Sequence, residues 1–266
     1  MPDEEHRSPS HHLTRKLSAL GKRVLGLLRP ANDVVYRGTV LPPRGLRFNQ
    51  PEQQDDGFYL HSADTEADRV VTTLGYTPDQ LIVDIGCGQG RLAIGLTRRY
   101  PGARYLGIDV SRRSIAWCRA AIEKRYPSYQ FRHVDVVNAR YNPAGRPLSR
   151  SFRLPVASGA ADIVYMWGLV TNMEPDHLPI YVAETSRMLR RGGQAFVTAN
   201  VEDDVPRVSI NPENYTPYAC IGPLHVVRYE REYFLDVFQY FGLKLTGYIY
   251  HGVGNSQSEI YFRRAP

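Results

Sequence analysis

The chain has few cysteines and no long apolar run. Its 266 residues include only three cysteines, Cys87, Cys118 and Cys220, an odd number with no paired spacing. This pattern argues against a disulfide-bonded secreted scaffold and favours a reducing compartment, so we expect a cytoplasmic protein. No stretch reaches the roughly 18 apolar residues that cross a bilayer, and the first residues lack the basic-then-apolar order of a signal peptide. We therefore expect neither a membrane span nor an export signal.

The excess of positive charge is also small. The formal net charge is +6 at pH 7, which modestly favours an anionic partner or surface but is too little to indicate nucleic acid alone. Apolar residues make up 42% of the chain and charged residues 23%, as in ordinary globular proteins. The length predicts one elaborated domain and leaves the oligomeric state open.

The most informative stretch is residues 81–90, where an apolar run ends in an acid and then breaks into alternating glycines. Residues 81–85 have the pattern of a buried parallel strand. Gly86, Gly88 and Gly90 predict a turn in which no Cβ keeps a ligand from the backbone. The third glycine comes one residue too early for the G-x-G-x-x-G dinucleotide fingerprint. This spacing indicates a nucleoside-bearing cofactor other than NAD.

A second acid, Asp109, follows the next apolar run and precedes an expected helix. An acid at this position can accept hydrogen bonds from both ribose hydroxyls. Together, Asp84, the three glycines and Asp109 resemble the S-adenosylmethionine (SAM) site of the class I methyltransferases. The resemblance covers residues 64–200 well and continues through three further motifs: Phe131-Arg-His-Val-Asp135-Val136, Ala161-Asp-Ile-Val-Tyr-Met-Trp167 and Arg190-Arg-Gly-Gly193.

The resemblance implies a fold, a cofactor and a set of binding residues. The fold is α/β, a seven-stranded, mostly parallel, doubly wound sheet of the Rossmann-like methyltransferase type, with two cap insertions and an N-terminal helix. The cofactor is SAM. Its implied binding residues are Asp84, Gly86, Cys87, Gly88, Gly90, Asp109, Val110, Asp135, Val136, Trp167 and the lid candidate Tyr59.

We divide the chain into an N-terminal arm, residues 1–63, and a methyltransferase domain, residues 64–266. Residues 13–29 of the arm predict a basic amphipathic helix, which either packs on its own domain or touches an anionic membrane surface or partner. The first domain helix is expected at about 64–75, just after the lid candidates Tyr59 and His61. A later helix is expected from about 176 to 190, with Arg190 and Arg191 in its last turn.

Two insertions interrupt the alternation of strands and helices, at 138–160 and 201–229. Both leave from the carboxyl ends of expected strands, where open α/β sheets bind ligands. The second insertion is rich in tyrosine, and polar aromatics suit a hydroxylated substrate because rings stack on the apolar faces of sugars. The insertions therefore predict an acceptor site above the cofactor.

An alkyl hydroxyl is a poor nucleophile and calls for a general base. His251, at the end of the sixth expected strand, and His225, in the second insertion, are our candidate bases, and His177 is a third. A divalent ion such as Mg²⁺ is the alternative way to activate a hydroxyl. Its candidate ligands are Glu202, Asp203 and Asp204 after the fifth strand, with Glu174 and Asp176 nearby.

The first insertion contains Tyr141-Asn-Pro-Ala-Gly145, and the last strand begins Gln257-Ser-Glu-Ile. These features resemble bacterial methyltransferases, several of them associated with cell-envelope polysaccharides and glycolipids, in which His often stands where this chain has Asn172. We therefore predict a sugar or oligosaccharide O-methyltransferase. The alternatives are an RNA methyltransferase, an enzyme acting on a lipid or other small-molecule hydroxyl, and a non-catalytic SAM-binding protein. The chain lacks the Asp/Asn-Pro-Pro-aromatic motif of amine methylation in nucleic acids, which disfavours a nucleic-acid partner.

Overall fold

The computed structural model describes residues 33–48, 51–217, 219–252 and 257–266. The amphipathic helix expected at 13–29 lies outside the described residues. Within them, no helix combines the length and the apolar character that a bilayer crossing needs.

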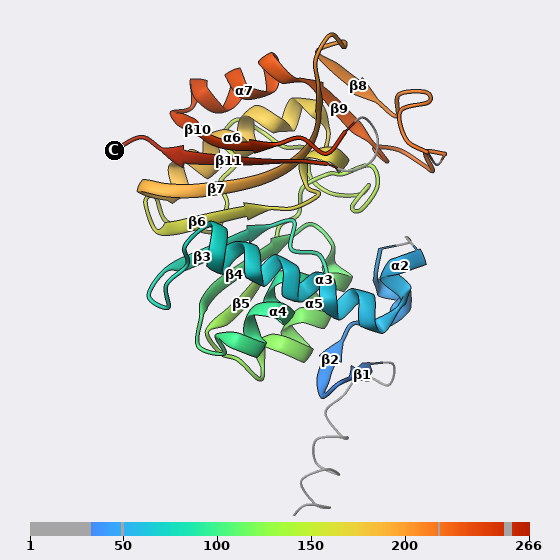
Figure 1. Ribbon diagram of the computed structural model, residues 1–266, viewed down its shortest axis with the longest axis vertical. Coiled ribbons are helices and arrows are strands. Elements are labelled where there is room, and N and C mark those ends of the chain that lie inside the picture. Colours follow the sequence, from blue (N-terminus) through green and yellow to red (C-terminus); the bar gives the residue numbers. More distant parts are fainter. Residues whose placement is uncertain (1–32, 49–50, 218, 253–256) are drawn as a thin grey trace, which may run out of the picture.

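The core of the molecule is a sheet of nine strands, seven of which form its main row while β8 (Val208–Ile210) and β9 (Val227–Glu230) lie off that row (Figure 1). In spatial order the strands of the main row are β10 (Leu243–Ile249), β11 (Ser258–Arg264), β7 (Leu189–Glu202), β6 (Ala161–Met166), β3 (Leu81–Ile85), β4 (Arg104–Asp109) and β5 (Tyr129–His133). The five strands from β7 to β5 run parallel, and β11 is antiparallel to both of its neighbours. The mostly parallel, seven-stranded α/β fold expected from the sequence is therefore confirmed.

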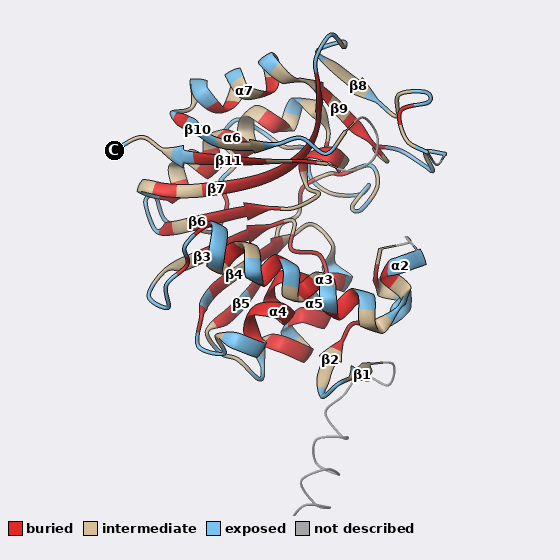
Figure 2. Cartoon of the chain, viewed as in Figure 1, coloured by how far each residue is buried: buried red, intermediate tan, exposed pale blue. Residues whose placement is uncertain are grey.

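Helices cover both faces of this sheet. The helices are α3 (Asp56–Asp68), continued by the π-helical turn η2 (Arg69–Thr73), α4 (Arg91–Arg99), α5 (Arg112–Cys118), continued by η3 (Arg119–Glu123), α6 (Leu178–Met188) and α7 (Arg231–Tyr240). Successive residues of a strand point to opposite faces. Ile82 accordingly belongs to the apolar cluster of α3, α4 and α5, whereas Val83 belongs to that of α6 and α7. Figure 2 shows the buried strands between these layers.

Local signals in the sequence explain several helix ends. The Ser111 side chain accepts a hydrogen bond from the Ser114 amide at the start of α5, and Glu230 does the same for Tyr233 at the start of α7. Such caps satisfy amides that have no partner within the helix. Gly242 follows α7 with φ +77°, a conformation that glycine adopts without steric cost.

Two element boundaries differ from those expected. The first domain helix begins at Asp56 rather than near residue 64, because Asp55 caps it by accepting from the Phe58 amide. Consequently Tyr59 lies inside α3. Helix α6 ends at Met188, so Arg190 belongs to β7 and not to the last turn of the helix. From β7 the Arg190 side chain forms an ion pair with Asp162 of β6.

The insertions and the N-terminal segment add short elements around the sheet. The segment before α3 contains β1 (Val34–Tyr36), β2 (Thr39–Leu41), η1 (Arg44–Leu46) and α2 (Pro51–Gln54). The first insertion is mostly irregular and is followed by η4 (Val170–Asn172) and η5 (Pro175–His177) beyond β6. The second insertion contains β8 (Val208–Ile210) and ends in β9 (Val227–Glu230), which pairs in parallel with the carboxyl end of β7. Both insertions thus lie at the same end of the sheet.

Candidate cofactor and acceptor site

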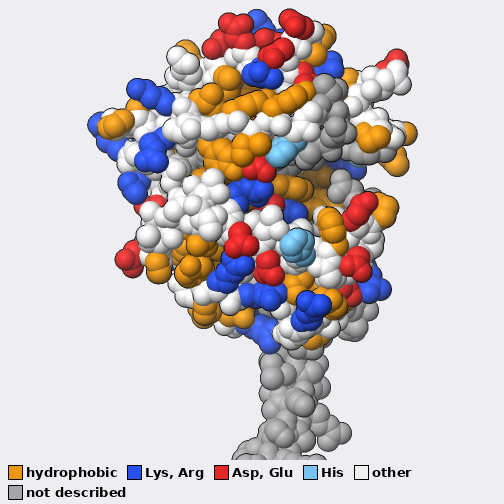
Figure 3. All heavy atoms as spheres, in the orientation of Figure 1, with side chains coloured by type: hydrophobic (Ala, Val, Ile, Leu, Met, Phe, Trp, Pro, Cys, Tyr) orange, Lys and Arg blue, Asp and Glu red, His pale blue; other side chains and the backbone are white. Residues whose placement is uncertain are grey.

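A pocket of about 1070 Å³ lies at the carboxyl ends of β3, β4, β6 and β7. Its walls come from the turns that follow these strands, from residues 45–52, and from both insertions. Figure 3 shows a hollow in this face of the molecule. Hydrophobic side chains there lie beside basic, acidic and histidine side chains. The pocket is therefore at the edge where parallel α/β sheets bind their ligands.

The glycine turn forms one wall of the pocket. Gly86, Gly88 and Gly90 have φ values of +78°, +51° and +69°. A Cβ on Gly90 would lie 2.9 Å from the Ile122 side chain, so packing as well as backbone conformation requires glycine there. Gly86 and Gly88 therefore present bare backbone to the pocket, as a ligand lying against it requires, whereas Gly90 packs against the core.

Asp109 holds the turn in this shape. One carboxylate oxygen accepts the Gly88 amide at 2.8 Å, and the other accepts the Ser111 amide at 2.7 Å. Burial raises the pKa of Asp109, although these amide bonds act in the opposite direction. Each carboxylate oxygen has a second lone pair, so the group can still accept from a ribose hydroxyl.

Six of the eleven cofactor residues predicted from the sequence line this pocket: Gly86, Gly88, Asp109, Val110, Val136 and Trp167. Asp84 is buried outside the pocket lining and accepts from the Tyr105 hydroxyl at 2.5 Å. Its burial raises its pKa to about 7. Cys87 and Gly90 also lie outside the lining, and burial raises the pKa of the Cys87 thiol.

The other two predicted cofactor residues make contacts elsewhere. Tyr59 is fully buried in α3, where the Arg47 guanidinium lies 4.7 Å from its ring centre. It is therefore a core residue in this conformation rather than part of an open lid. Asp135 accepts from the Asn142 side chain at 3.2 Å and so joins β5 to the first insertion. The cofactor roles of these residues stay predictions.

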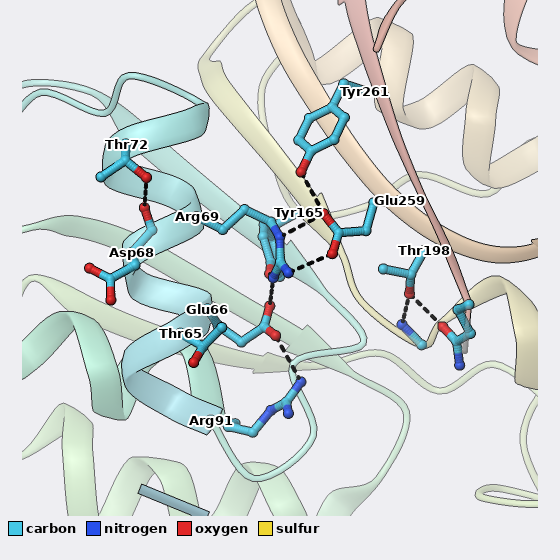
Figure 4. Close-up of polar contacts among 12 residues, drawn as sticks. Thr65, Glu66, Asp68, Arg69, Thr72, Arg91, Tyr165, Thr198, Glu259 and Tyr261 are labelled. Atoms are coloured by element: carbon cyan, nitrogen blue, oxygen red, sulfur yellow. Dashed lines mark hydrogen bonds and ion pairs between the residues drawn. The ribbon is translucent and has the colours of Figure 1, made fainter. Parts of the chain in front are cut away.

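A network of charges lies beside Trp167, whose ring contacts the Arg91 guanidinium. Figure 4 shows the acidic and basic side chains of this network. Glu66 pairs with Arg69 at 2.7 Å and with Arg91 at 3.6 Å. Arg69 also pairs with Glu259 of β11 at 2.8 Å. Burial alone would raise the pKa of Glu259, but hydrogen bonds from Tyr261 and Arg69, together with the charge of Arg69, lower it. Glu259 is therefore an ionised carboxylate in the pocket wall.

The candidate bases occupy different places. His225 lines the pocket, and its Nδ1 accepts the Ile221 amide at 2.7 Å. Burial, assisted by the charge of Arg140, lowers the pKa of His225, so the ring is neutral at pH 7. A neutral ring that accepts at Nδ1 carries its proton on Nε2. His225 is thus a donor in this arrangement, and acting as a base would require the Ile221 hydrogen bond to break.

His251 is not among the residues that line the pocket. Its Nε2 lies 3.4 Å from a carboxylate oxygen of Glu259, which does line the pocket, so among the described residues Glu259 links it to the pocket wall. The third candidate, His177, does line the pocket. Burial lowers its pKa even though the charges of Glu174 and Asp176 oppose the shift. The assignment of a base among the three stays a prediction.

Comparison with known proteins decides the class. A family model described as a methyltransferase domain matches residues 82–193, which include the glycine turn, Asp109 and Trp167. Residues 82–193 therefore form a SAM-dependent methyltransferase domain. The methyl donor of such a domain is SAM, and Gly86, Gly88, Asp109, Val110 and Val136 line the pocket that would hold it.

Curated relatives of the methyltransferase match only part of it. A trans-aconitate 2-methyltransferase of Escherichia coli is 36% identical over 83 residues, which are 30% of this chain and 31% of the relative. A trans-aconitate 2-methyltransferase of Shigella dysenteriae matches to the same extent. The chain therefore spans about a third of the length of the curated relatives it matches.

Solved structures share the fold of the methyltransferase over most of its length. The 1,6-didemethyltoxoflavin-N1-methyltransferase of Burkholderia thailandensis is 12% identical, with a TM-score of 0.55, and the match covers 100% of this chain and 94% of that one. The [4+2]-cyclase SpnF is 15% identical, also with a TM-score of 0.55, over 94% and 95% of the two chains. Since a cyclase shares the fold, the fold alone does not define the chemistry.

The acidic cluster after β7 of the methyltransferase binds protein side chains. Glu202 accepts from the hydroxyls of Tyr215 at 2.9 Å and Tyr250 at 2.7 Å, and Asp203 pairs with Arg231 at 3.0 Å. In the part of the chain that the structure describes, no group of three or more His, Cys, Asp or Glu residues could hold a metal ion. Glu202 is therefore satisfied by tyrosines and needs no ion to compensate its burial.

Sequence reasoning missed several polar residues of the pocket. Asn172, which replaces the histidine of some relatives, donates its side-chain amide to the carbonyls of Leu224 and His225, both at 2.8 Å. It therefore anchors the second insertion over the pocket. Thr198, Asn200 and Gln257 also line the pocket, from the ends of β7 and the start of β11. One sequence signal could have predicted part of this set: Thr198 and Asn200 are two residues apart on one strand, so their side chains point to the same face of the sheet.

Proposed function

We propose that the methyltransferase acts on a small hydroxylated acceptor and transfers the methyl group of SAM to a hydroxyl oxygen of a sugar or oligosaccharide. The observation that supports this proposal is the chemistry of the pocket wall away from the glycine turn. Four neutral side chains with hydrogen-bonding groups meet there: Asn172, Thr198, Asn200 and Gln257. Neutral amides and hydroxyls match the alternating donors and acceptors of a polyol.

The charge beside these four residues supports a neutral acceptor. Arg69, which lies in the same wall, is already paired with Glu66 and Glu259. A carboxylate acceptor, such as the one named for the trans-aconitate relatives, would therefore have to pair with an arginine other than Arg69, such as Arg140, whose side chain donates to the Ile221 carbonyl. The size of the pocket also suits SAM together with a small acceptor.

The test is release of S-adenosylhomocysteine with a panel of mono- and oligosaccharides, run beside trans-aconitate, an RNA and a phenolic lipid. We expect turnover with at least one sugar and none with trans-aconitate. Mg²⁺ and a chelator, added in parallel, show whether turnover depends on a divalent ion. Turnover with trans-aconitate, RNA or the lipid, and with no sugar, would replace the sugar assignment by that acceptor class.

A control variant ties the signal to this pocket. Asn200→Ala removes one of the four polar side chains, whereas Asn214→Ala changes a residue outside the pocket lining. We expect the first change to raise the KM of the sugar roughly tenfold with little effect on SAM affinity, since Asn200 lines the pocket, although its side-chain amide also donates to the Val227 carbonyl at 3.3 Å. The second change should leave both constants unaltered.

A further inference from the structure

Gln257 lies where three strands bring polar groups together. Strand β11 runs antiparallel to β7, with Ser258 opposite Ala199, so its first residues lie at the carboxyl end of β7. Gly168 follows the neighbouring strand β6 and reaches the same edge. Thr198, Gln257 and Gly168 all line the pocket. An antiparallel last strand therefore places a glutamine side chain among groups supplied by two parallel strands.

A chain of two hydrogen bonds fixes the orientation of this glutamine. The Gly168 amide donates to Thr198 Oγ1 at 2.7 Å, and the Thr198 hydroxyl donates to Gln257 Oε1 at 2.5 Å. Figure 4 shows Thr198 between its two partners. A hydroxyl has only one proton, and the Gly168 amide can only donate, so the Thr198 proton points to Gln257. The oxygen end of the Gln257 amide is thereby engaged.

The nitrogen end of the amide lies near Gly168, which lines the pocket as Gln257 does. A Cβ built on Gly168 would lie 4.0 Å from Gln257 Nε2. Gly168 itself has φ +65° and follows Trp167 in the pocket wall. Nε2 carries two protons and has no acceptor capacity. The pocket therefore contains a hydrogen-bond donor whose orientation the protein has already set.

We propose that Gln257 is a specificity-determining residue that selects an oxygen nucleophile over an amine nitrogen. This inference rests on the proposed function for the identity of the acceptor, but it concerns the nucleophilic atom. A hydroxyl oxygen has two lone pairs, so it can accept from Gln257 Nε2 with one and attack the methyl carbon with the other. A neutral amine has a single lone pair, which cannot do both. The donor therefore favours oxygen.

The transfer balances without a further reactant. The acceptor oxygen forms a bond to the methyl carbon while the bond between that carbon and sulfur breaks, and the sulfonium becomes a thioether. The hydroxyl proton passes to the general base, for which His225, His177 and His251 are the candidates. Gln257 gives up no proton in this step, because its role is to hold the oxygen in line with the methyl group.

The test compares an acceptor hydroxyl compound with its amino analogue, assayed at alkaline pH where the amine is neutral. Gln257→Glu has the same shape but replaces the donor with acceptor oxygens. We expect it to lower kcat/KM for the hydroxyl compound at least tenfold and to raise the amine-to-hydroxyl ratio at least tenfold. SAM affinity should stay within about twofold. Gln130→Glu, which adds the same charge at an exposed position of β5, should change neither value.

Variants of Thr198 test whether the Gln257 amide must be held in its orientation or need only be present. Thr198→Val removes the hydroxyl that engages Gln257 Oε1 and should also relax the preference for oxygen, whereas Thr198→Ser should retain it. An unchanged amine-to-hydroxyl ratio in Gln257→Glu, or equal methylation of the two compounds by the parent protein, would overturn the inference. Phenol and aniline pairs belong in the panel. If no sugar is methylated but Gln257→Glu raises the amine-to-hydroxyl ratio with aniline and phenol, the sugar assignment is wrong and the role of Gln257 is supported. If the parent protein methylates only nitrogen, both proposals are wrong.

Discussion

The guanidinium of Arg91 stacks on Trp167, with its central carbon 3.8 Å from the centre of the ring. The Arg91 side chain is only 9% exposed and also faces Glu66 at 3.6 Å. Trp167 lines the pocket immediately after β6. Because the cation covers one side of the indole, it holds the ring as a fixed part of the pocket wall. The first helical residue after the glycine turn is thus structural support for the cofactor site.

Arg91→Ala should lower the free energy of unfolding by about 3 kcal/mol, because it removes the stacked cation and leaves Glu66 with one buried partner fewer. Urea denaturation followed by circular dichroism measures this change. The matched control is Arg99→Ala, which breaks an exposed ion pair with Asp68 and should cost less than about 1 kcal/mol. An equal decrease in the free energy of unfolding in the two variants would show that the buried contacts of Arg91 with Trp167 and Glu66 add no more stability than an exposed ion pair.

Asp109→Ala should weaken SAM binding at least about 100-fold, or roughly 2.7 kcal/mol. The change removes the acceptor of the Gly88 and Ser111 amides, and with it the expected ribose acceptor. Isothermal titration calorimetry with SAM gives the affinity. Asp203→Ala, a change at an exposed acid outside the pocket lining, should bind SAM as the parent does. Near-normal affinity of the Asp109 variant would refute its role.

His225→Ala should lower kcat/KM for the acceptor about 100-fold and leave SAM affinity nearly unchanged, because His225 lines the pocket. His251→Ala should lower it less than about tenfold, since that ring is linked to the pocket wall through Glu259. Steady-state kinetics at saturating SAM separates the two. His225→Gln keeps an N–H donor, so it should retain much of the activity if His225 donates and lose it if His225 is the base. Parent rates in both alanine variants would exclude both residues.

The stability of the protein should fall as pH rises from about 4 to about 7 through the titration of Asp84. Burial raises the pKa of its carboxyl to about 7 in the folded protein, against an ordinary value of 3.8. Between these values the folded state holds a proton that the unfolded state has released, which costs up to about 1.4 kcal/mol per pH unit. Urea denaturation of the parent and of Asp84→Asn from pH 4 to 8 measures the effect. As pH rises, the free energy of unfolding of Asp84→Asn should increase relative to that of the parent. Parallel plots of the two free energies against pH would contradict the raised pKa of Asp84.

Local patterns were enough to predict the sheet and the glycine turn. The apolar run of 81–85, the three glycines and Asp109 indicate strand, turn and acid within a short stretch, and the structure brings them together as expected. Such features are readable because each depends on neighbours close in sequence. The same local reasoning misplaced the start of α3, because it places Asp55 and Asp56 in the N-terminal arm although Asp55 caps the helix.

The amino-acid sequence by itself determined the parallel α/β sheet, the glycine turn and the acid that follows the next strand. Only the tertiary structure decided which polar groups line the pocket. Gln257 and Thr198 are 59 residues apart in the chain and hydrogen-bond because β11 runs antiparallel to β7. His225 presents a donor because of a hydrogen bond within its loop. Strand direction and loop closure are set by the packing of the whole chain, so no local pattern reports them.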